Sequence, residues 1–186
     1  MRIISGELKG RSINFLKNSN TRPLKDVVRE NIFNILNHSK RLSINVENSN
    51  ILDLYSGTGS FGIEAISRGA KKVFFVEQND IATKILKDNL IKLSIINKTL
   101  IFNNMIEDFL YKKIGEKFDI FFLDPPFADS KFLKNLELIK KGKIYKKKNI
   151  IIIHRENKSK DKLDNFIKVI NTKLYGRSKI IFGSFV

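Results

Sequence analysis

The stretch "NILDLYSGTGSFGIEAISRGAKKVFFVEQ", residues 50–78, joins an apolar run, a glycine-rich turn, a helical pattern and a second apolar run. The outer runs, residues 50–56 and 71–78, have the length and composition of strands. Between them, Ser60 to Arg68 has helical spacing and stops at Gly69, a residue that commonly ends helices. A strand, a helix and a strand in this order predict a βαβ unit in a parallel sheet.

The same alternation continues toward the carboxyl end of the chain. A hairpin turned at Gly176-Arg177 closes the sequence, so we expect a mostly parallel sheet with a final antiparallel strand. This pattern predicts an α/β fold with a Rossmann-like sheet. The further strands are expected at residues 99–104, 118–124 and 149–154, and the further helices at 80–93 and 107–113 and around 130–140 and 160–170.

Residues 1–48 stand apart from this alternation. Residues 2–15 alternate like a hairpin, and residues 25–37 place apolar side chains at helical spacing. We therefore predict two units: an N-terminal hairpin and helix, residues 1–48, and an α/β domain, residues 49–186.

The charge of the chain is strongly positive and unevenly placed. The net charge is +16, of which residues 131–186 carry +12, residues 1–48 carry +5 and residues 49–130 carry −1. Two basic ends around a nearly neutral centre indicate a polyanionic partner.

The chain contains no cysteine and two histidines, His38 and His154. This composition excludes disulfides and thiolate zinc sites, and we expect no metal. No signal-peptide pattern is visible and no apolar run reaches the ~20 residues of a membrane span, so we expect a cytoplasmic protein, monomeric and without membrane contact.

The glycine-rich turn permits two interpretations. Gly57, Gly59 and Gly62 fit Gly-x-Gly-x-x-Gly and Glu77 ends the next strand, as in dinucleotide-binding folds. Asp53 lies four residues before Gly57; it is poorly suited to a pyrophosphate, because both are anionic, but would attract the ammonium of a methionine moiety. A nicotinamide dehydrogenase remains open, while Asp53 favours a cofactor with a positive charge.

Asp-x-x-x-Gly-x-Gly, followed by an acid after the second strand, resembles the cofactor loop of class I S-adenosylmethionine methyltransferases. The resemblance implies that Glu77 binds the ribose hydroxyls and that Asn104 accepts a hydrogen bond from the adenine amine, where the family commonly has Asp. It implies S-adenosyl-L-methionine as cofactor, with contacts from Asp53, Tyr55, Ser56, Gly57, Thr58, Gly59, Glu77, Gln78, Asn104 and Met105.

The stretch "IFFLDPPFAD", residues 120–129, runs a strand into an acid, two prolines and an aromatic ring. Prolines end the ladder and stiffen the turn, so the residues indicate either a pocket for a planar group or a plain strand-ending turn. The stretch resembles the Asp-Pro-Pro-Phe motif of methyltransferases that act on exocyclic amines. That resemblance implies catalytic roles for Asp124, Pro125, Pro126 and Phe127: the carboxylate and the Pro125 carbonyl accept the amine N–H groups, and the ring stacks on the base.

Five segments in order, "MRIISGELKGRSI", "TRPLKDVVRENIFNIL", "ILDLYSGTGSFGIEAISRGA", "LDPPF" and "YGRSKIIFGSF", resemble the RsmD family of bacterial 16S ribosomal RNA guanine-N2 methyltransferases. The family implies guanine N2 as the target, whereas the residues alone give an exocyclic amine. Two departures are Leu24 and Lys25, where threonines are expected, and the fifth-strand end "IIIHRE", residues 151–156.

The expected partner is small-subunit ribosomal RNA or an assembling small ribosomal subunit. Arginine can donate two hydrogen bonds to one phosphate. We therefore expect residues 1–48 to be an RNA-binding appendage to the methyltransferase domain, residues 49–186, with RNA contacts from Arg2, Arg11, Arg22 and Arg29. The alternative is that Arg22 and Arg29 form local ion pairs with Asp26 or Glu30. Two rival functions remain, a DNA adenine-N6 methyltransferase and a non-catalytic RNA-binding module.

Overall fold

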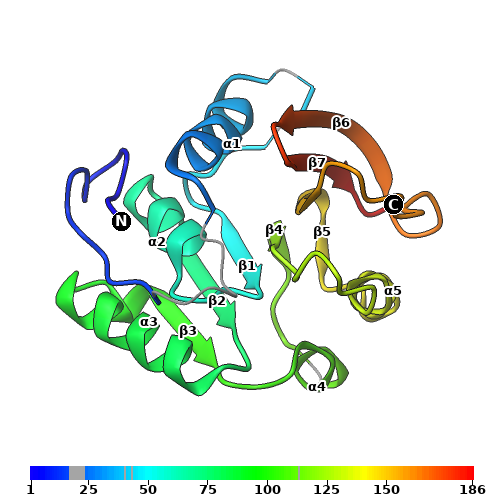
Figure 1. Ribbon diagram of the computed structural model, residues 1–186. Helices are drawn as coiled ribbons and strands as arrows, with labels where there is room; N and C mark the ends of the chain where they lie inside the picture. The colour runs from blue at the N-terminus through cyan, green and yellow to red at the C-terminus, as the bar shows by residue number, and fades with distance from the viewer. Residues whose placement is uncertain (17–23, 40, 43, 113) are drawn as a thin grey trace.

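The computed structural model describes residues 1–16, 24–39, 41–42, 44–112 and 114–186. Its centre is a seven-stranded sheet in the order β3-β2-β1-β4-β5-β7-β6, in which β7 runs antiparallel to both of its neighbours and the other pairs are parallel (Figure 1). The predicted α/β class and the antiparallel final strand are confirmed. The strands are β1 (Asn50–Leu54), β2 (Lys72–Val76), β3 (Thr99–Phe102), β4 (Phe118–Leu123), β5 (Tyr145–Glu156), β6 (Lys168–Tyr175) and β7 (Ser178–Ser184).

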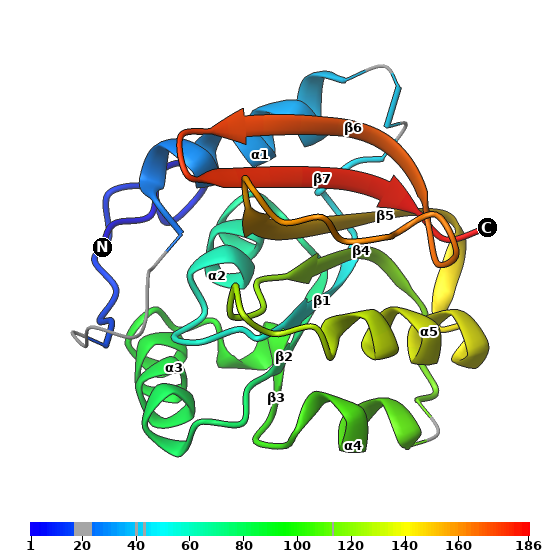
Figure 2. The same cartoon turned by 45° about the vertical axis from the view of Figure 1, so that its right-hand side comes forward.

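Helices cover both faces of the sheet (Figures 1 and 2). One face carries the first three helices and the other carries the last two, as their buried residues show by falling into two separate apolar clusters. The helices are α1 (Asp26–His38), α2 (Ser60–Ser67), α3 (Asp80–Lys92), α4 (Ile106–Tyr111) and α5 (Phe132–Gly142), with a short 3-10 helix, η1 (Ile96–Lys98), before β3.

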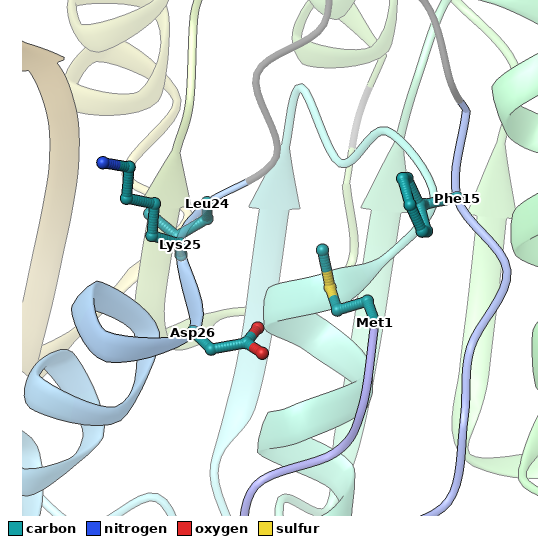
Figure 3. Close-up of a pocket in the computed structure, with 5 residues that line it drawn as sticks. All are labelled: Met1, Phe15, Leu24, Lys25 and Asp26. Atoms are coloured by element: carbon teal, nitrogen blue, oxygen red, sulfur yellow. The ribbon is translucent and has the colours of Figure 1, made fainter.

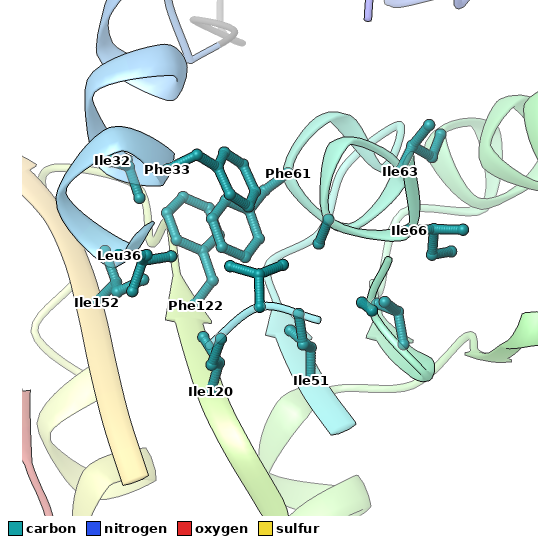
Figure 4. Packing of buried hydrophobic residues seen from close by; sticks show 14 of the residues in the cluster. Ile32, Phe33, Leu36, Ile51, Phe61, Ile63, Ile66, Ile120, Phe122 and Ile152 are labelled. Atoms are coloured by element: carbon teal, nitrogen blue, oxygen red, sulfur yellow. The ribbon is translucent and has the colours of Figure 1, made fainter. Parts of the chain in front are cut away.

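The central strands are mostly apolar on both sides because each face of the sheet is covered by helices. In β4, Phe122 belongs to the cluster under α1 and α2, while Phe121 belongs to the cluster under α5. Three rings stack in series through the first cluster: Phe33 of α1 lies 5.0 Å from Phe61 of α2, which lies 4.0 Å from Phe122 (Figure 4). The N-terminal helix therefore shares a core with the sheet.

Residues 1–14 form a short antiparallel pairing, as predicted, with an isolated bridge between Arg2 and Ser12. Two backbone N–H groups, those of Ile4 and Ser5, donate to the buried Glu64 of α2 at 2.8 and 3.0 Å. Gly6 approaches the same helix so closely that a Cβ would lie 1.8 Å from the carbonyl oxygen of Ser67. Packing is thus continuous across residue 49, and the division of roles at that point stays a prediction.

The predicted helix around residues 160–170 is wrong. Residues 164–166 form a single turn, and β6 begins at Lys168. The buried Leu163 and Ile167 have the spacing of a helix, and the backbone N–H of Ile167 does bond to the carbonyl of Leu163 at 3.0 Å. Pairing with β7 then draws the following residues into a hairpin, whose turn at Gly176 was predicted.

Two classes of feature are not found among the described residues. No described helix has the length and apolar character needed to cross a bilayer. Within the same residues, no group of three or more His, Cys, Asp or Glu side chains is arranged to hold a metal ion.

Candidate active site

Three acids meet at the carboxyl edge of the sheet. Leu54 of β1 pairs with Val76 of β2 on one side and with Leu123 of β4 on the other, so Glu77 and Asp124 each follow directly after a neighbouring strand. Asp53 lies one residue before that level. The edge between β1 and β4 is where the chain reverses its direction of winding, and ligands of open α/β sheets bind at such points.

Asp53 is the most buried of the three acids, with 1% of its surface exposed. Its Oδ2 accepts a hydrogen bond from the backbone N–H of Gly62 at 3.0 Å, whereas its Oδ1 is buried and has no partner among the described residues. Burial raises the pKa of Asp53 well above its usual value, and the charges of Asp124 and Glu77 raise it further. A cation beside Oδ1 would satisfy that oxygen and favour the ionised form.

The glycines of the loop after β1 have different roles. A Cβ at Gly59 would lie 2.4 Å from the side chain of Leu86, and a Cβ at Gly62 would lie 2.3 Å from the ring of Phe75, so helix packing requires both glycines. At Gly57, where φ is +53°, a Cβ would meet no described atom within 4 Å. Gly57 therefore borders open space in which a ligand can approach the backbone.

Glu77 holds the glycine loop, which we define as residues 55–59. Its Oε2 accepts a hydrogen bond from the N–H of Gly57 at 2.8 Å, and its Oε1 accepts one from the N–H of Asn79 at 2.9 Å. The carboxylate is half-buried and joins the loop to the start of α3. Each of its oxygens keeps a lone pair for a further donor.

Tyr55, Ser56 and Thr58 of this loop each form hydrogen bonds within the protein. Tyr55 adopts a left-handed φ of 60°, and its hydroxyl donates to Asp129 at 3.3 Å and accepts from Asn135 at 2.9 Å. Burial raises the pKa of Tyr55, which keeps the hydroxyl protonated as a donor. Ser56 is buried with its hydroxyl toward the carbonyl of Val76.

A buried asparagine, Asn89 of α3, fixes the far end of the glycine loop. Its side-chain amide donates to the carbonyls of Thr58 at 3.2 Å and Asn14 at 2.9 Å, and its Oδ1 accepts from the N–H of Asn14 at 2.8 Å. The N-terminal segment is thereby tied to the predicted cofactor loop, a link that no motif in the sequence indicates.

The remaining predicted cofactor residues lie around this edge. Gln78 is exposed after β2, Asn104 is half-buried after β3, and Met105, directly before α4, is 49% exposed. Nearby, Asn103 donates to Asp80 of α3 at 2.6 Å. The structure thus brings Gln78, Asn104 and Met105 to the sheet edge that carries the acids, and their contacts to a cofactor stay predictions.

The loop after β4, which we call the acceptor loop and define as residues 124–129, is held by side chains of β5. Asp124 Oδ1 lies 2.7 Å from Nδ1 of His154. The guanidinium of Arg155 donates to the carbonyls of Pro126 and Phe127, both at 3.1 Å. Within the loop, Pro125 is buried, Pro126 is exposed and Phe127 is half-buried.

His154 and Arg155 were not among the predicted site residues. Their signal was present as a histidine and an arginine that follow four isoleucines at the carboxyl end of a parallel strand. That position lies on the ligand-binding edge of such sheets, so its polar side chains are candidates for a site. Asp161 was missed as well because only the loop after β5 brings it to Arg155, at 3.0 Å.

The four predicted RNA-binding arginines have different surroundings. Arg2 and Arg11 are exposed, and Arg11 donates to the carbonyl of Lys92 at 3.1 Å. Arg22 lies outside the described residues. Arg29 corrects the prediction: its side chain is 1% exposed and pairs with Asp26 at 3.0 Å and with Glu64 at 3.7 Å. A buried guanidinium does not reach an RNA phosphate, so Arg29 has a structural role in docking α1.

A hollow of about 230 Å³ lies on the N-terminal segment. It is lined by Met1, Phe15, Leu24, Lys25 and Asp26, and the carboxylate of Asp26 points toward Met1 (Figure 3). Asp53, Glu77 and Asp124 are not among its lining residues, so we do not assign it to the site at the sheet edge.

Comparison with known proteins gives one family. Residues 1–184 match the family model described as conserved hypothetical protein 95. A protein of Buchnera aphidicola subsp. Baizongia pistaciae named ribosomal RNA small subunit methyltransferase D is 37% identical over 157 residues, covering 84% of this chain and 76% of that protein. The Escherichia coli protein of the same name is 31% identical over 139 residues, covering 75% and 66%. The solved structure of yhhF from Escherichia coli, a proposed methyltransferase, has a TM-score of 0.83 and 25% identity, covering 100% of this chain and 97% of that one.

Proposed function

The chain belongs to the RsmD family, described by its model as conserved hypothetical protein 95, and from this premise we propose that it methylates the N2 amine of a guanine in 16S ribosomal RNA with S-adenosyl-L-methionine. The observation that carries the proposal is the position of Asp124. It precedes two prolines and a half-exposed ring, and it lies at one sheet edge with Asp53 and Glu77. One edge thus offers acceptors for an amine beside acceptors for a cationic cofactor.

The residues at the glycine loop fit the cofactor. When bound, S-adenosyl-L-methionine would supply a methyl group carried on a positively charged sulfur. Asp53 would hold its ammonium through the unpartnered Oδ1, and Gly57 leaves space for its approach to the backbone. Glu77 would accept hydrogen bonds from the ribose hydroxyls, because each of its oxygens keeps a lone pair beside the bond from the N–H of Gly57 or Asn79.

The acceptor loop fits an exocyclic amine. Such an amine is a poor nucleophile because its lone pair is delocalised into the ring. Asp124 and the carbonyl of Pro125 would accept its two N–H groups, and Phe127 would stack on the base, which localises and aims the lone pair. The nitrogen loses one proton on forming the product, and the Asp124 carboxylate, 24% exposed, can pass it to water.

The proposed RNA substrate is supported by the charge of the chain and by its sequence relatives. The net charge of +16 suits a polyanion, and the named relatives are ribosomal RNA methyltransferases. We propose that the enzyme acts in the cytoplasm on small-subunit RNA or an assembling subunit. We also propose that it acts as a monomer, because the three acids and both loops come from one chain.

The test is methyl transfer from radiolabelled S-adenosyl-L-methionine to small subunits and to naked 16S RNA from a strain that lacks the gene. Nucleoside mass spectrometry should show N2-methylguanosine, and Asp124→Ala should greatly slow its formation. N6-methyladenosine in duplex DNA would support the DNA-methyltransferase alternative. RNA binding without transfer to any substrate would support a non-catalytic module.

A further inference from the structure

The fifth strand brings two consecutive polar side chains onto the acceptor loop. Ile153 of β5 pairs with Leu123 of β4, so His154 and Asp124 are the next residues along two adjacent parallel strands. His154 is 7% exposed at its side chain, and its ring also meets that of Phe127 edge-on, with centroids 5.5 Å apart. The histidine therefore contacts both the acid and the aromatic ring of the loop.

The geometry assigns the proton of the His154 ring. An ionised carboxylate only accepts hydrogen bonds, so the 2.7 Å contact between Nδ1 and Asp124 Oδ1 needs a proton on Nδ1. Nε2 is buried and has no partner among the described residues. A buried N–H without an acceptor is unfavourable, so the geometry favours the tautomer with its proton on Nδ1.

Arg155 occupies the rest of the loop without engaging Asp124. Its guanidinium is 3% exposed, lies 4.4 Å from the centre of the Phe132 ring and bonds to both oxygens of Asp161, at 3.0 and 3.3 Å. Burial acts to raise the pKa of Asp161, but the hydrogen bonds and the charge of Arg155 hold it below its usual value. The charge of Arg155 is thus balanced by Asp161, and its remaining N–H groups fix the carbonyls of the loop.

These contacts take up three acceptors of the loop. Asp124 Oδ1 is taken by His154, and the carbonyls of Pro126 and Phe127 are taken by Arg155. For Asp124 Oδ2 and the carbonyl of Pro125, no hydrogen bond is found within the described part of the chain. An amine with two N–H groups needs two acceptors, and these two adjacent residues supply them.

We propose that His154 is a positioning residue of the methyl transfer, which holds Asp124 by Oδ1 so that Oδ2 alone is presented to the substrate amine. The inference rests on the proposed function for its consequence in catalysis. A carboxylate without this contact is free to rotate about its terminal bond, and a loosely oriented acceptor loses much of its effect on the rate.

Two substitutions separate the hydrogen bond from the packing of the ring. His154→Phe keeps a ring against Phe127 and removes the donor. His154→Asn removes the ring and keeps an amide N–H close to the place of Nδ1. We expect His154→Phe to lower kcat on the order of tenfold or more with the Kd for S-adenosylmethionine unchanged, and His154→Asn to stay nearer to wild type. The exposed His38→Asn is the control for histidine replacement.

The opposite order, an active Phe variant and a poor Asn variant, would assign His154 to ring packing and overturn the proposal. Equal activity of both variants and the wild type would also overturn it. If the wild type itself transfers no methyl group to ribosomal RNA, the proposed function fails, and the His154 contact is then decided by spectroscopy.

That spectroscopic test needs no substrate. The chain has two histidines, so ¹⁵N-labelled His38→Asn protein gives imidazole signals from His154 alone. We expect a proton on Nδ1, and a changed Nδ1–H signal when Asp124→Ala is added. A proton on Nε2 in the unsubstituted site, or a spectrum indifferent to Asp124→Ala, would contradict the proposed contact.

Discussion

The glycine loop and the acceptor loop lie at the same sheet edge but are held in different ways. The glycine loop combines close packing with side chains that bind its backbone: Gly59 fits against Leu86, Glu77 accepts from the N–H of Gly57, and Asn89 donates to the carbonyl of Thr58. The acceptor loop is fixed by the side chains of His154 and Arg155, from the next strand. The spacing of its glycines makes the first loop recognisable in the sequence. The sequence of the acceptor loop shows that loop's own residues but not the side chains that hold it.

The two loops are nevertheless joined. The hydroxyl of Tyr55, in the glycine loop, donates to Asp129 at the end of the acceptor loop and accepts from Asn135 of α5. Changes in one loop therefore test how far the division between cofactor and substrate roles extends.

The largest expected effect is on turnover at the acceptor loop. Asp124→Ala should lower kcat on the order of a hundredfold and leave cofactor affinity near wild type, because an acceptor aimed at the reacting amine acts in the transition state. Steady-state kinetics and calorimetry measure the two quantities, with the exposed Asp108→Ala as control. A loss of less than about tenfold would mark the loop as a plain turn.

The next effect is on stability in α2, the helix that follows the glycine loop. Gly62→Ala should lower the free energy of unfolding by about 1–3 kcal/mol, because its Cβ would overlap the ring of Phe75 and force repacking. Gly115→Ala is the matched control, since a Cβ there meets no described atom within 4 Å. Urea unfolding compares the variants, and equal stabilities would show that packing at Gly62 is looser than the structure indicates.

Asp53 should affect the cofactor and not the amine. Asp53→Ala is expected to raise the Kd for S-adenosylmethionine about tenfold, the loss of one well-placed charged contact. With saturating cofactor, kcat should change much less than in Asp124→Ala. A variant that binds the cofactor normally would remove Asp53 from the site and leave its burial without a ligand.

The raised pKa of Asp53 makes a smaller, pH-dependent prediction. Burial raises the pKa of Asp53 in the protein without cofactor, and a bound ammonium would lower the pKa of Asp53. Binding should therefore release protons. Affinity should then increase as pH rises from about 4, the usual value for Asp, through the raised pKa, and level off above it. Calorimetry in two buffers of different ionisation enthalpy detects the released proton, and Asp53→Asn should abolish the effect.

The smallest effect concerns a third region, the N-terminal segment. Arg11→Ala should weaken RNA binding and reduce the log–log salt slope by roughly one unit, as expected for one lost phosphate contact. Cofactor affinity should not change. Arg177→Ala, at the exposed β6–β7 turn, is the matched comparison. A flatter slope for Arg177→Ala alone would move the RNA contact to the basic carboxyl-terminal third.

Sequence patterns predicted the long and periodic elements well. The strands of the βαβ unit and the helix at Asp80–Lys92 appear where apolar spacing put them. The pattern failed where a partner strand decided the outcome, at residues 160–170, because one helical turn and the start of a strand share the same apolar spacing. At Arg29 the predicted RNA contact is wrong and the alternative, a local ion pair with Asp26, is confirmed, whereas the second partner, Glu64 of α2, had no signal in the sequence.

The sequence by itself determined the α/β alternation, the family and the three acids at strand ends, because strand periodicity and short motifs are local properties of the chain. Only the tertiary structure decided which oxygen of Asp124 is left for a substrate, which glycine faces open space and which arginine is buried. Those outcomes depend on contacts between residues that strand order and register bring together: His154 reaches Asp124 from 30 positions away, and Glu64 holds the N–H of Ile4 from 60. Such contacts cannot be predicted from the spacing of residues in the sequence.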